Sequence, residues 1–549
     1  MNDSSSSAES RTEGGGSEIG TLPAVDLVGA GLLPALPAAF AKGEALELLG
    51  PLRFLEAGSV PARIDHQPDR SVLAEGLAVA NAGYGHPSAQ AQAARLADPK
   101  TEVVVTGQQT GLFGGPLYTL SKAIAATLWV ERLEAAGRRA VAVFWMATED
   151  HDFREVSRAG FPASSGLLDL DLGADPAPLM PIGMRALGPN VERALDELRA
   201  SVPGQRFGAW LDRLATWYRR DARFGEAFAR LMADLLGERC PLLLDAMLPA
   251  VKAVEQPWLA AIHEQHEQLD AAYAERDREI QAAGFDLQVS PQPGSSPLFY
   301  LHGAERRRLE PRGDTITLRG VEGFEQSAEW MAEVLRDNPA VVSPGVLARP
   351  AVQDAILGTC LQILGPGEVS YMPQVAPIYE VLGIAAPYIS IRPQALALGE
   401  HQLGKLDSIG LALAALIEPG LDLDRALGGG EADALVAEAR TDISERLDQL
   451  GSRALEIDVS LGGPLKKTRD RIDGALAAFS AKAVQAAGRR DLVRRQRAQA
   501  LRDACLPGGS PQERVVSSAY FPGKYGDRFV GALFDQLSLD WRRLSVVRL

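Results

Sequence analysis

The chain has 549 residues, of which 56 are basic and 71 acidic, so its net charge is −15 with the histidines neutral. Apolar residues make up 46% and charged residues 23%, which is typical of globular proteins and excludes disorder over most of the length. The acidic balance argues against a general nucleic-acid or anionic-membrane binder, because both ligands are held mainly by clustered Lys and Arg. We therefore expect no nucleic-acid partner and no membrane partner.

The cysteines and the N-terminal residues exclude further classes of protein and of metal site. Cys240, Cys360 and Cys505 lie far apart with no CxxC pair, which excludes a disulfide scaffold and a Cys-rich zinc or iron–sulfur site. Residues 1–20 are mostly Ser, Gly and acidic residues, so they are predicted to form a disordered tail. Because no signal peptide and no apolar run of roughly 18 residues is visible, a cytoplasmic protein is expected.

The first clear structural pattern begins at residue 102. Residues 102–106 form a β-branched run suited to a strand buried on both faces, and they enter a Gly-rich loop over 107–116. Pro116 suits the start of a helix over 117–136, and 140–145 is a second apolar run. Strand, helix and strand in this order predict a βαβ unit and hence a parallel sheet, with 242–245, 287–289 and 298–301 as further strands.

Two helical regions follow. Residues 190–281 read as mostly helical, and Trp210, Leu214, Trp217 and Tyr218 at helical spacing predict a core stripe. Residues 431–504 divide at Gly462-Gly463-Pro464 into an acidic and a basic half, which predicts an antiparallel helical hairpin. An apolar or small residue recurs every seven positions in the second half, as in a coiled coil: Leu465, Ile472, Phe479, Ala486, Val493 and Ala500. The basic half either faces the acidic helix and solvent, or receives a phosphate-bearing ligand or a second subunit.

The Gly-rich loop is the first candidate site. It follows a strand and opens a helix, which is where ligands bind in an open parallel sheet. Its sequence is neither GxGxxG nor GxxxxGK[ST], so a standard dinucleotide or P-loop assignment fails. Gln108 and Gln109 suit a polar small molecule, and Lys122 in the following helix supplies a cation. The alternative is a turn that only packs the helix on the sheet.

The second candidate site follows the strand over 140–145. Glu149, Asp150 and Asp152 surround His151, and an imidazole beside carboxylates can act as a general base near neutral pH. A divalent metal site and a helix N-cap at Asp150 or Asp152 are the alternatives. By the geometry of a parallel sheet, this cluster should line the same cavity as the glutamine-bearing loop.

A third cluster lies between residues 349 and 371. Arg349 and Gln353 stand at the start of one segment, and Arg349 could hold a carboxylate through two parallel hydrogen bonds. Gly365-Pro366-Gly367-Glu368 then places an acid on a Gly-rich backbone, followed by Tyr371. Polar residues this dense in apolar surroundings favour ligand contact.

Four stretches together resemble the BshC family, the cysteine-adding ligases of bacillithiol synthesis. They are VVVTGQQTGLFGGPLYTLSK, VFWMATEDHDF, RPAVQDAILGTCLQILGPGEVSYMPQ and SPQERVVSSAYFPGKYG, which span residues 103–526. The resemblance implies addition of cysteine to the amino group of glucosaminyl malate, with formation of an amide, as the last step toward bacillithiol. It also implies a Rossmann-like core, a coiled-coil arm, a homodimer, and a likeness to class I nucleotidylyl-transferring enzymes, although no HIGH or KMSKS sequence is present.

For this reaction we assign hypothetical roles to the candidate residues. His151, oriented by Asp150 or Asp152, is the expected base for the glucosamine nitrogen. Substrate contacts are expected from Gln108, Gln109, Thr110, Gly111, Tyr118, Lys122, Arg349, Gln353, Glu368 and Tyr371, with backbone N–H groups of 111–115 at a developing oxyanion. Nucleotide contacts are expected from Gln512, Arg514, Tyr520 and Tyr525. The energy donor is unknown, ATP or another nucleotide being the candidates, and no resident metal is expected.

The predicted fold class is thus α/β, with helical insertions in the core and an arm. The predicted segments are a tail (1–20), the first part of the core (21–185), a helical insertion (186–284), the second part of the core (285–425), the arm (426–506) and a C-terminal segment returning to the core (507–549). Three other functions compete: an amino-acid-activating nucleotidyl transferase with another acceptor, a non-catalytic scaffold that uses the arm, and a metal-dependent hydrolase that uses residues 149–152.

Overall fold

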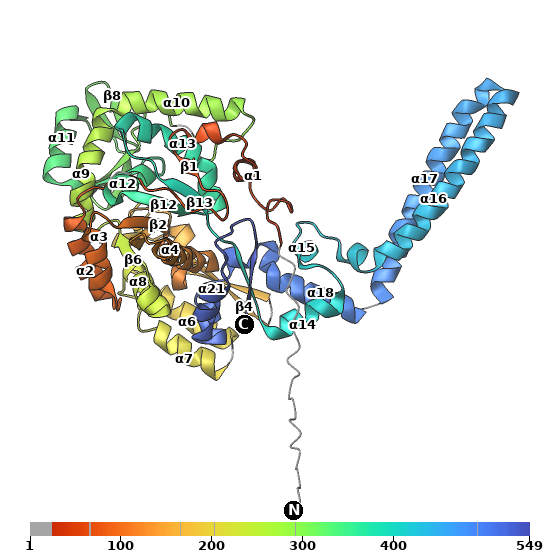
Figure 1. The fold of residues 1–549 in the computed structure, drawn as a ribbon, viewed down its shortest axis with the longest axis horizontal. Helices are drawn as coiled ribbons and strands as arrows, with labels where there is room; N and C mark the ends of the chain where they lie inside the picture. The colour runs from red at the N-terminus through yellow and green to blue at the C-terminus, as the bar shows by residue number, and fades with distance from the viewer. Residues whose placement is uncertain (1–24, 65–66, 165, 203, 291, 491) are drawn as a thin grey trace, which may run out of the picture.

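A computed structural model describes residues 25–64, 67–164, 166–202, 204–290, 292–490 and 492–549. The predicted tail over 1–20 lies outside these ranges. The chain forms a main body from which a long helical arm projects (Figure 1). None of the helices in the described ranges combines the length and the apolarity needed to span a membrane.

The main body is built on a six-stranded sheet in which every neighbouring pair is parallel. Its strand order is β1-β13-β12-β2-β3-β6. The strands are β1 (Arg53–Phe54), β2 (Glu102–Gln108), β3 (Ala140–Met146), β6 (Leu242–Asp245), β12 (Thr359–Leu364) and β13 (Tyr388–Ile391). The predicted strands at 102–106, 140–145 and 242–245 and the parallel Rossmann-like core are confirmed; β1, β12 and β13 were not predicted.

Helices cover both faces of this sheet, which explains the unbroken apolar runs of its central strands. One face packs against α4 (Leu117–Ala135), the helix predicted after the Gly-rich loop. The other face packs mainly against α2 (Ser71–Tyr84), α3 (Ala89–Ala97) and α9 (Pro249–Glu264). Alternate residues of β3 therefore enter different cores, with Phe144 on the α4 side and Trp145 on the other.

A second, antiparallel sheet corrects the prediction for the segment after residue 285. Its order is β10-β9-β8-β7-β11, formed by β7 (Leu298–His302), β8 (Glu305–Arg312), β9 (Thr315–Leu318), β10 (Gln326–Ser327) and β11 (Val342–Pro344). The strand at 298–301 exists but belongs to this sheet. The prediction of a strand at 287–289 is wrong. The N–H groups of Gln288 and Val289 donate to the side chain of Gln374, at 3.1 and 2.9 Å, and not to a neighbouring strand.

The region between β5 (Gly166–Asp171) and β7 is mostly helical, as predicted. Its helices are α6 (Asn190–Ser201), α7 (Gln205–Leu214), α8 (Phe224–Leu236), α9 and α10 (His266–Ala282). Trp210, Leu214 and Tyr218 are buried and Trp217 packs against the same core, so the predicted core stripe is confirmed. The remaining elements of the body include α1 (Ala35–Ala41), α5 (Phe153–Val156), the β4–β5 hairpin (Arg158–Ala163, Gly166–Asp171), α11 (Ala328–Asp337), α12 (Arg349–Leu357) and α13 (Pro366–Leu382).

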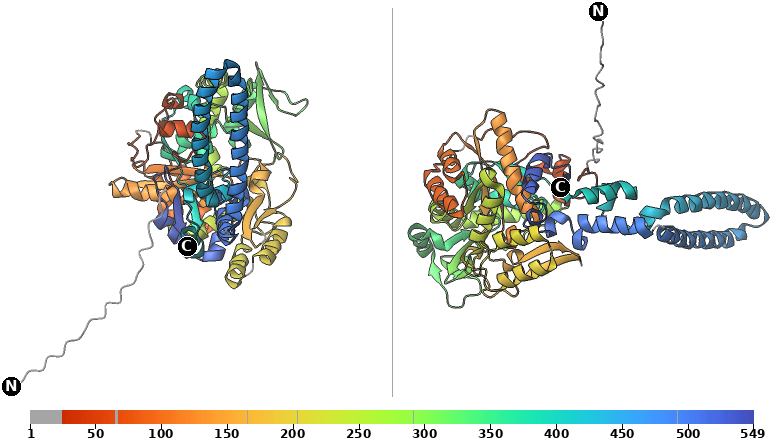
Figure 2. Two further views of the ribbon diagram at one scale, coloured as in Figure 1. Left: turned by 90° about the vertical axis from the view of Figure 1, so that its right-hand side faces the viewer. Right: turned by 90° about the horizontal axis from the view of Figure 1, so that it is seen from below.

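The arm is the predicted helical hairpin, formed by α16 (Leu423–Ile457) and α17 (Gly462–Arg490) packed along each other (Figure 2). It joins the body through α14 (Glu400–Ile409), α15 (Leu413–Leu416) and α18 (Leu492–Cys505). Ion pairs between Arg440 and Asp473 (3.2 Å) and between Arg469 and Asp448 link the two long helices. Part of the basic half therefore faces the acidic helix.

The strict seven-residue repeat does not stay in the seam between these helices. Leu465 and Ile472 are half-buried, but Phe479 is 62% exposed, Val493 is 56% exposed, and Ala486 and Ala500 are also exposed. A straight α-helix rotates about 20° past each heptad, so positions seven apart leave the contact face after a few turns. The predicted coiled-coil arm is present, but its apolar repeat continues onto an outer face.

The C-terminal segment returns to the body through α19 (Gln512–Val515), α20 (Tyr520–Tyr525), α21 (Arg528–Gln536) and β15 (Ser545–Arg548). Strand β15 pairs in parallel with β14 (Ala395–Leu398). Glu513 accepts hydrogen bonds from Arg392 at 2.9 and 2.6 Å and from the backbone of Ala395 at 2.9 Å, and the Arg392 and Glu513 side chains are buried. This bidentate pair fixes the segment to the end of β13.

We expect Glu513→Ala to lower the free energy of unfolding by about 3–5 kcal/mol, because it leaves the Arg392 guanidinium buried without its partner. Urea denaturation monitored by circular dichroism measures the change. The control is Glu192→Ala, which breaks an exposed pair with Arg220 and should have a much smaller effect. Equal losses in the two variants would contradict the assigned role of the buried pair.

Candidate functional site

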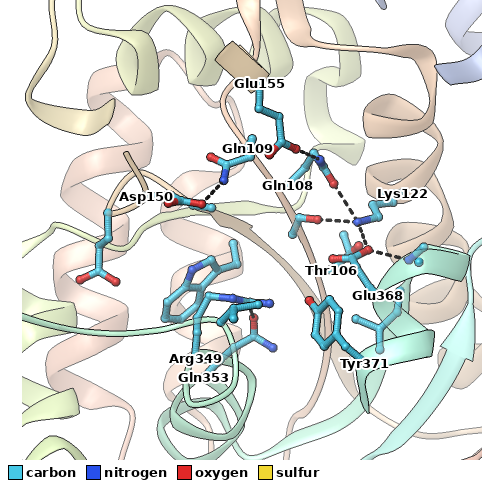
Figure 3. A pocket seen from close by; sticks show the side chains of 18 of the residues that line it. Thr106, Gln108, Gln109, Lys122, Asp150, Glu155, Arg349, Gln353, Glu368 and Tyr371 are labelled. Atoms are coloured by element: carbon cyan, nitrogen blue, oxygen red, sulfur yellow. Dashed lines mark hydrogen bonds and ion pairs between the residues drawn. The ribbon is translucent and has the colours of Figure 1, made fainter. Parts of the chain in front are cut away.

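A cavity of about 510 Å³ opens at the carboxyl ends of β2, β3 and β12. The three predicted clusters meet on its wall (Figure 3). Among the predicted residues, those that line it are Gln108, Gln109, Tyr118, Lys122, Asp150, His151, Arg349, Gln353, Glu368, Tyr371 and Arg514. The glutamine-bearing loop and the imidazole thus share one cavity, as the sequence analysis required.

The Gly-rich loop places only its first residues on the cavity. Thr110 and Gly111 are buried beneath the wall, and the N–H groups of Gly111, Gly114 and Gly115 donate to carbonyl oxygens within the loop at 2.9–3.2 Å. Three of the five backbone donors expected at an oxyanion are therefore already used, and none of residues 110–115 lines the cavity, which argues against that role. The loop is held from outside by Ser517, whose hydroxyl donates to the carbonyl of Phe113 at 2.9 Å.

Lys122 is the centre of one polar group on the wall. Its ammonium donates to the carbonyl of Gly107 at 2.8 Å and to Oε1 of Gln108 at 2.9 Å, and it pairs with Glu368. The same Glu368 carboxylate accepts the N–H of Gly365 at 2.6 Å and so caps α13. Burial lowers the pKa of Lys122, which the pairing with Glu368 opposes. Residues from β2, α4 and α13 are thereby fixed to one another.

His151 lies at the end of β3, half-buried in the cavity wall. Asp150 accepts the backbone N–H of His151 at 2.7 Å through Oδ1 and the amide of Gln109 at 2.6 Å through Oδ2. Asp152 instead caps α5, accepting the N–H of Glu155 at 3.2 Å. The N-cap alternative therefore describes Asp152, which does not line this cavity.

The sequence analysis missed Arg306, which β8 of the antiparallel sheet brings to the cavity. Its guanidinium donates to Oγ of Ser343 at 2.9 Å, to the carbonyl of Pro344 at 2.8 Å and to Nδ1 of His151 at 3.4 Å. Burial lowers the pKa of Arg306 to about 10. Burial and the charge of Arg306 lower the pKa of His151 from its ordinary 6.5, which favours the neutral imidazole.

Arg349 and Gln353 stand together at the start of α12. Arg349 donates to Oε1 of Gln353 at 3.0 Å, and Gln353 donates to buried Asp354 at 3.2 Å. Tyr379 and Gln362 also donate to Asp354, whose pKa burial raises to about 6. This buried network orients the Arg349 guanidinium toward the cavity (Figure 3).

Three buried polar atoms on the wall have no partner among the described residues. They are Oε1 of Gln109, the indole N–H of Trp145 and Oε1 of Gln362, and all three residues line the cavity. A buried polar atom left unpaired costs about 1–3 kcal/mol, so one donor and two acceptors are available to a ligand here. Gln109 was predicted; Trp145 and Gln362 were not, because both lie inside otherwise apolar strands.

Glu155 is a further residue that the sequence analysis missed. It lies on α5 with its carboxylate in the cavity, 3.5 Å from the amide of Gln108. Burial and the nearby charges of Asp150, Asp152 and Glu368 raise its pKa to about 7. A carboxyl group that titrates near neutral pH is suited to proton transfer. The acidic residues within 149–155 are a sequence signal of a polar site. Only the helical turn of α5, however, places Glu155 at the cavity.

Of the predicted nucleotide contacts, only Arg514 lines the cavity. The amide of Gln512 pairs with the backbone N–H and carbonyl of Ala397 at 2.8 and 2.9 Å. Tyr520 packs among aromatic rings of the core, including Phe161 and Phe207. Tyr525 is half-buried beside Lys524. In the described part of the chain, no three His, Cys, Asp or Glu side chains are grouped as metal ligands.

Comparison with known sequence families gives two matches that together cover most of the chain. Residues 54–393 match "Bacillithiol biosynthesis BshC, N-terminal Rossmann-like domain", and residues 395–548 match "Bacillithiol biosynthesis BshC, C-terminal coiled-coil domain".

Curated relatives agree with these matches. A protein of Solibacter usitatus named "Putative cysteine ligase BshC" is 30% identical over 89% of this chain and 92% of its own. A Salinibacter ruber protein of the same name is 31% identical over 87% and 89%. A solved structure titled a putative arginyl tRNA synthetase from Campylobacter jejuni aligns over 85% of this chain and 99% of its own at 11% identity, with a TM-score of only 0.25. The likeness to class I nucleotidylyl-transferring enzymes stays a prediction.

The raised pKa of Glu155 predicts a pH dependence of stability. Since its folded pKa is about 7 and its ordinary value 4.5, the folded protein retains a proton that the unfolded chain has lost between these values. The free energy of unfolding should therefore fall as pH rises through this window. We expect Glu155→Gln to show a smaller fall than the native protein in urea denaturation between pH 5 and pH 8. Exposed Glu44→Gln is the control; a fall that is unchanged in Glu155→Gln would refute the assignment.

Proposed function

The chain belongs to the BshC family of bacillithiol biosynthesis, and we propose that it is a cysteine ligase that joins the carboxyl group of cysteine to the amino group of glucosaminyl malate. The observation that carries this proposal is the convergence of the three clusters on one cavity. Neutral amides, carboxylates and guanidinium groups on one wall suit two charged, polar substrates, one of which, glucosaminyl malate, also carries hydroxyl groups. In this proposal, the amide formed is the last bond of bacillithiol.

Amide formation requires an unprotonated amine and an activated carboxyl group. Glu155, with its pKa of about 7, and the neutral imidazole of His151 are the two groups of the cavity that could accept the amine proton. Arg349 and Arg514 are the cations of the wall that would bind malate or phosphate oxygens, because the ammonium of Lys122 already donates to Gly107, Gln108 and Glu368 and Arg392 is paired with Glu513. Gln108, Gln109 and the unpaired atoms of Trp145 and Gln362 supply neutral donors and acceptors for hydroxyl groups.

We propose ATP, or another nucleoside triphosphate, as the co-reactant that activates the carboxyl oxygen for departure. The residue that fits its phosphates is Arg514, on the cavity wall near Pro366 and Gly367. Its guanidinium can bind phosphate oxygens through two parallel hydrogen bonds. Arg392 also lines the cavity but is paired with Glu513, and the start of α13 is already capped by Glu368. Residues Gln512, Tyr520 and Tyr525 are not part of this proposed site.

We expect the purified protein with cysteine, glucosaminyl malate and ATP to form bacillithiol, detected by mass spectrometry. Arg349→Ala should raise the KM for the anionic substrate about 10–100-fold, because a hydrogen bond between charged groups contributes about 1.5–3 kcal/mol. The control is Arg336→Ala, an exposed arginine paired with neighbouring Asp337, which should leave KM unchanged. Amide formation with cysteine but only on a different amine would support the competing nucleotidyl transferase function and refute the substrate proposed here.

We also propose that the protein is a homodimer whose second copy covers the outer face of the arm. Phe479 of α17 is more than half exposed there, as are Leu492 and Val493 at the start of α18, where the arm joins the body, and exposed apolar side chains mark interaction surfaces. A long hairpin with such side chains suits pairing with an identical hairpin.

Analytical ultracentrifugation tests the homodimer. We expect the native protein to sediment as a dimer and Phe479→Glu to shift it toward the monomer, because the substitution places a charge in the apolar contact. Ala481→Glu is the control, since two residues further along the helix an exposed side chain points about 200° away. A native monomer, or equal effects of both substitutions, would contradict the proposal.

A further inference from the structure

The His151 ring stands between two cavities. It lines the cavity already described and also a neighbouring one of about 690 Å³, which Asp152, Arg154, Arg158 and Asp175 help to line. A group at the junction of two cavities is well placed to contact a bond formed between two substrates. Which of its two ring nitrogens carries the proton decides what chemistry it can do there.

The hydrogen bond at Nδ1 determines which ring nitrogen carries the proton. Arg306 Nη1 lies 3.4 Å from Nδ1 with its N–H directed at it. A guanidinium group has only donors, so Nδ1 must be the acceptor and carries no proton. In the neutral ring the proton is then on Nε2, which has no hydrogen-bond partner among the residues that the structure describes.

Neither flanking carboxylate is hydrogen-bonded to Nδ1. The Oδ1 atom of Asp150 lies 3.5 Å from Nδ1 without forming a hydrogen bond to it. Instead, Oδ1 accepts the backbone N–H of His151 at 2.7 Å, and Oδ2 accepts the amide of Gln109 (Figure 3). Asp152 caps α5. The remaining charged neighbour is Arg185, a cation, which cannot accept a proton from the ring either. The arrangement therefore differs from an Asp–His pair, in which a carboxylate accepts the Nδ1 proton.

Arg306 is rigidly placed for this contact. Its side chain is buried, bonded to Ser343 and Pro344, and stacked on the ring of Phe299 with its Cζ atom 3.9 Å from the ring centroid. It also lies 3.7 Å from Oδ1 of Asp150, which compensates its charge. A group fixed on four sides cannot turn away to let Nδ1 take a proton.

We propose that Arg306 is a positioning residue that holds neutral His151 in the Nε2–H form, so that His151 donates a hydrogen bond to the acyl oxygen of the reacting substrate and is not the base. This inference rests on the proposed function for the identity of the acyl group, but the state of the ring can be measured without any substrate. It leaves Glu155 as the group that accepts the amine proton.

The chemistry balances with these roles. The amine nitrogen forms a bond to the acyl carbon and gives one proton to the Glu155 carboxylate. Negative charge develops on the acyl oxygen, where the Nε2–H donor stabilises it. The bond from the acyl carbon to the oxygen activated by the nucleoside triphosphate then breaks, and that oxygen leaves with the electron pair. His151 neither gains nor loses a proton, which suits an imidazole whose pKa is lowered.

Nitrogen-15 NMR on protein labelled only in its histidines tests the inference directly. The chain has seven histidines, and the signals absent from His151→Gln identify those of His151. We expect the native protein above pH 7 to show a protonated Nε2 and an unprotonated Nδ1 for His151. In Arg306→Met the Nδ1–H form should become populated, and in Arg306→Lys, which keeps a donor, the Nε2–H form should predominate again.

Arg308→Met is the matched control. Arg308 lies on the same strand, lines the same cavity and stacks on the same Phe299 ring at 4.6 Å, but is not hydrogen-bonded to His151. The Nε2–H form should persist in this variant. A native Nδ1–H form would overturn the inference, and so would an unchanged Nε2–H form in Arg306→Met. If the Arg306 variants fail to fold, the spectrum of the native protein by itself tests the inference.

Kinetics give a second, independent reading. We expect His151→Ala to lower kcat about 100-fold, as is usual for loss of one donor to a developing oxyanion. The kcat of His151→Gln should be about tenfold higher than that of His151→Ala, because the glutamine amide N–H reaches as far as Nε2 of the native histidine. Equal losses in both variants would identify His151 as a base and overturn the inference. An inactive native protein that shows the Nε2–H form would instead refute the proposed ligase function and leave the tautomer established.

Discussion

The parallel alignment of β3, β2 and β12 is the constraint on which the rest of the structure depends. Residue pairs such as Val105 with Val143 and Gln362 with Val105 set the three strands in register, with all carboxyl ends at one edge. Segments that are more than 200 residues apart in the sequence therefore end beside one another. The cavity exists because polar residues follow each strand at that edge.

Placing so many charged groups near a buried edge requires that each be compensated. Lys122 is held by Glu368, and Arg306 lies beside Asp150. Just behind the wall, Lys252 pairs with Glu149 and, at 2.8 Å, with Glu255, all three being buried. Leaving one such charge without its partner is costly, so these pairs fix the geometry of the cavity as well as its charge.

Distant parts of the chain complete this edge. The antiparallel sheet supplies Arg306, and the C-terminal segment supplies Arg514 and the serine that holds the Gly-rich loop. The buried pair of Arg392 and Glu513 joins that segment to β13. The Rossmann-like region and the region that contains the arm therefore form one site, and the proposed ligase chemistry draws on both.

Much of this arrangement could be predicted from the sequence. The apolar runs at 102–106, 140–145 and 242–245 identify strands of a sheet covered on both faces, since such strands need no polar alternation. The order of strand, Gly-rich loop and helix then places Gln108, Gln109 and His151 at one edge, where the structure has them. The four motifs of the family could also be read directly, as could the helical hairpin of the arm.

Tertiary structure decided the partners of each polar group. The strand at 298–301 could be recognised from its residues, but the sheet it joins depends on pairing with β8 and β11. Arg306 is one of three successive arginines, and only the fold shows that it is buried against His151 while Asp152 caps a helix. Sequence spacing determines which residues follow a strand or share a helix face, because those are local periodicities. Hydrogen-bond partners brought together across 155 residues, as Arg306 and His151 are, depend on how separate elements pack.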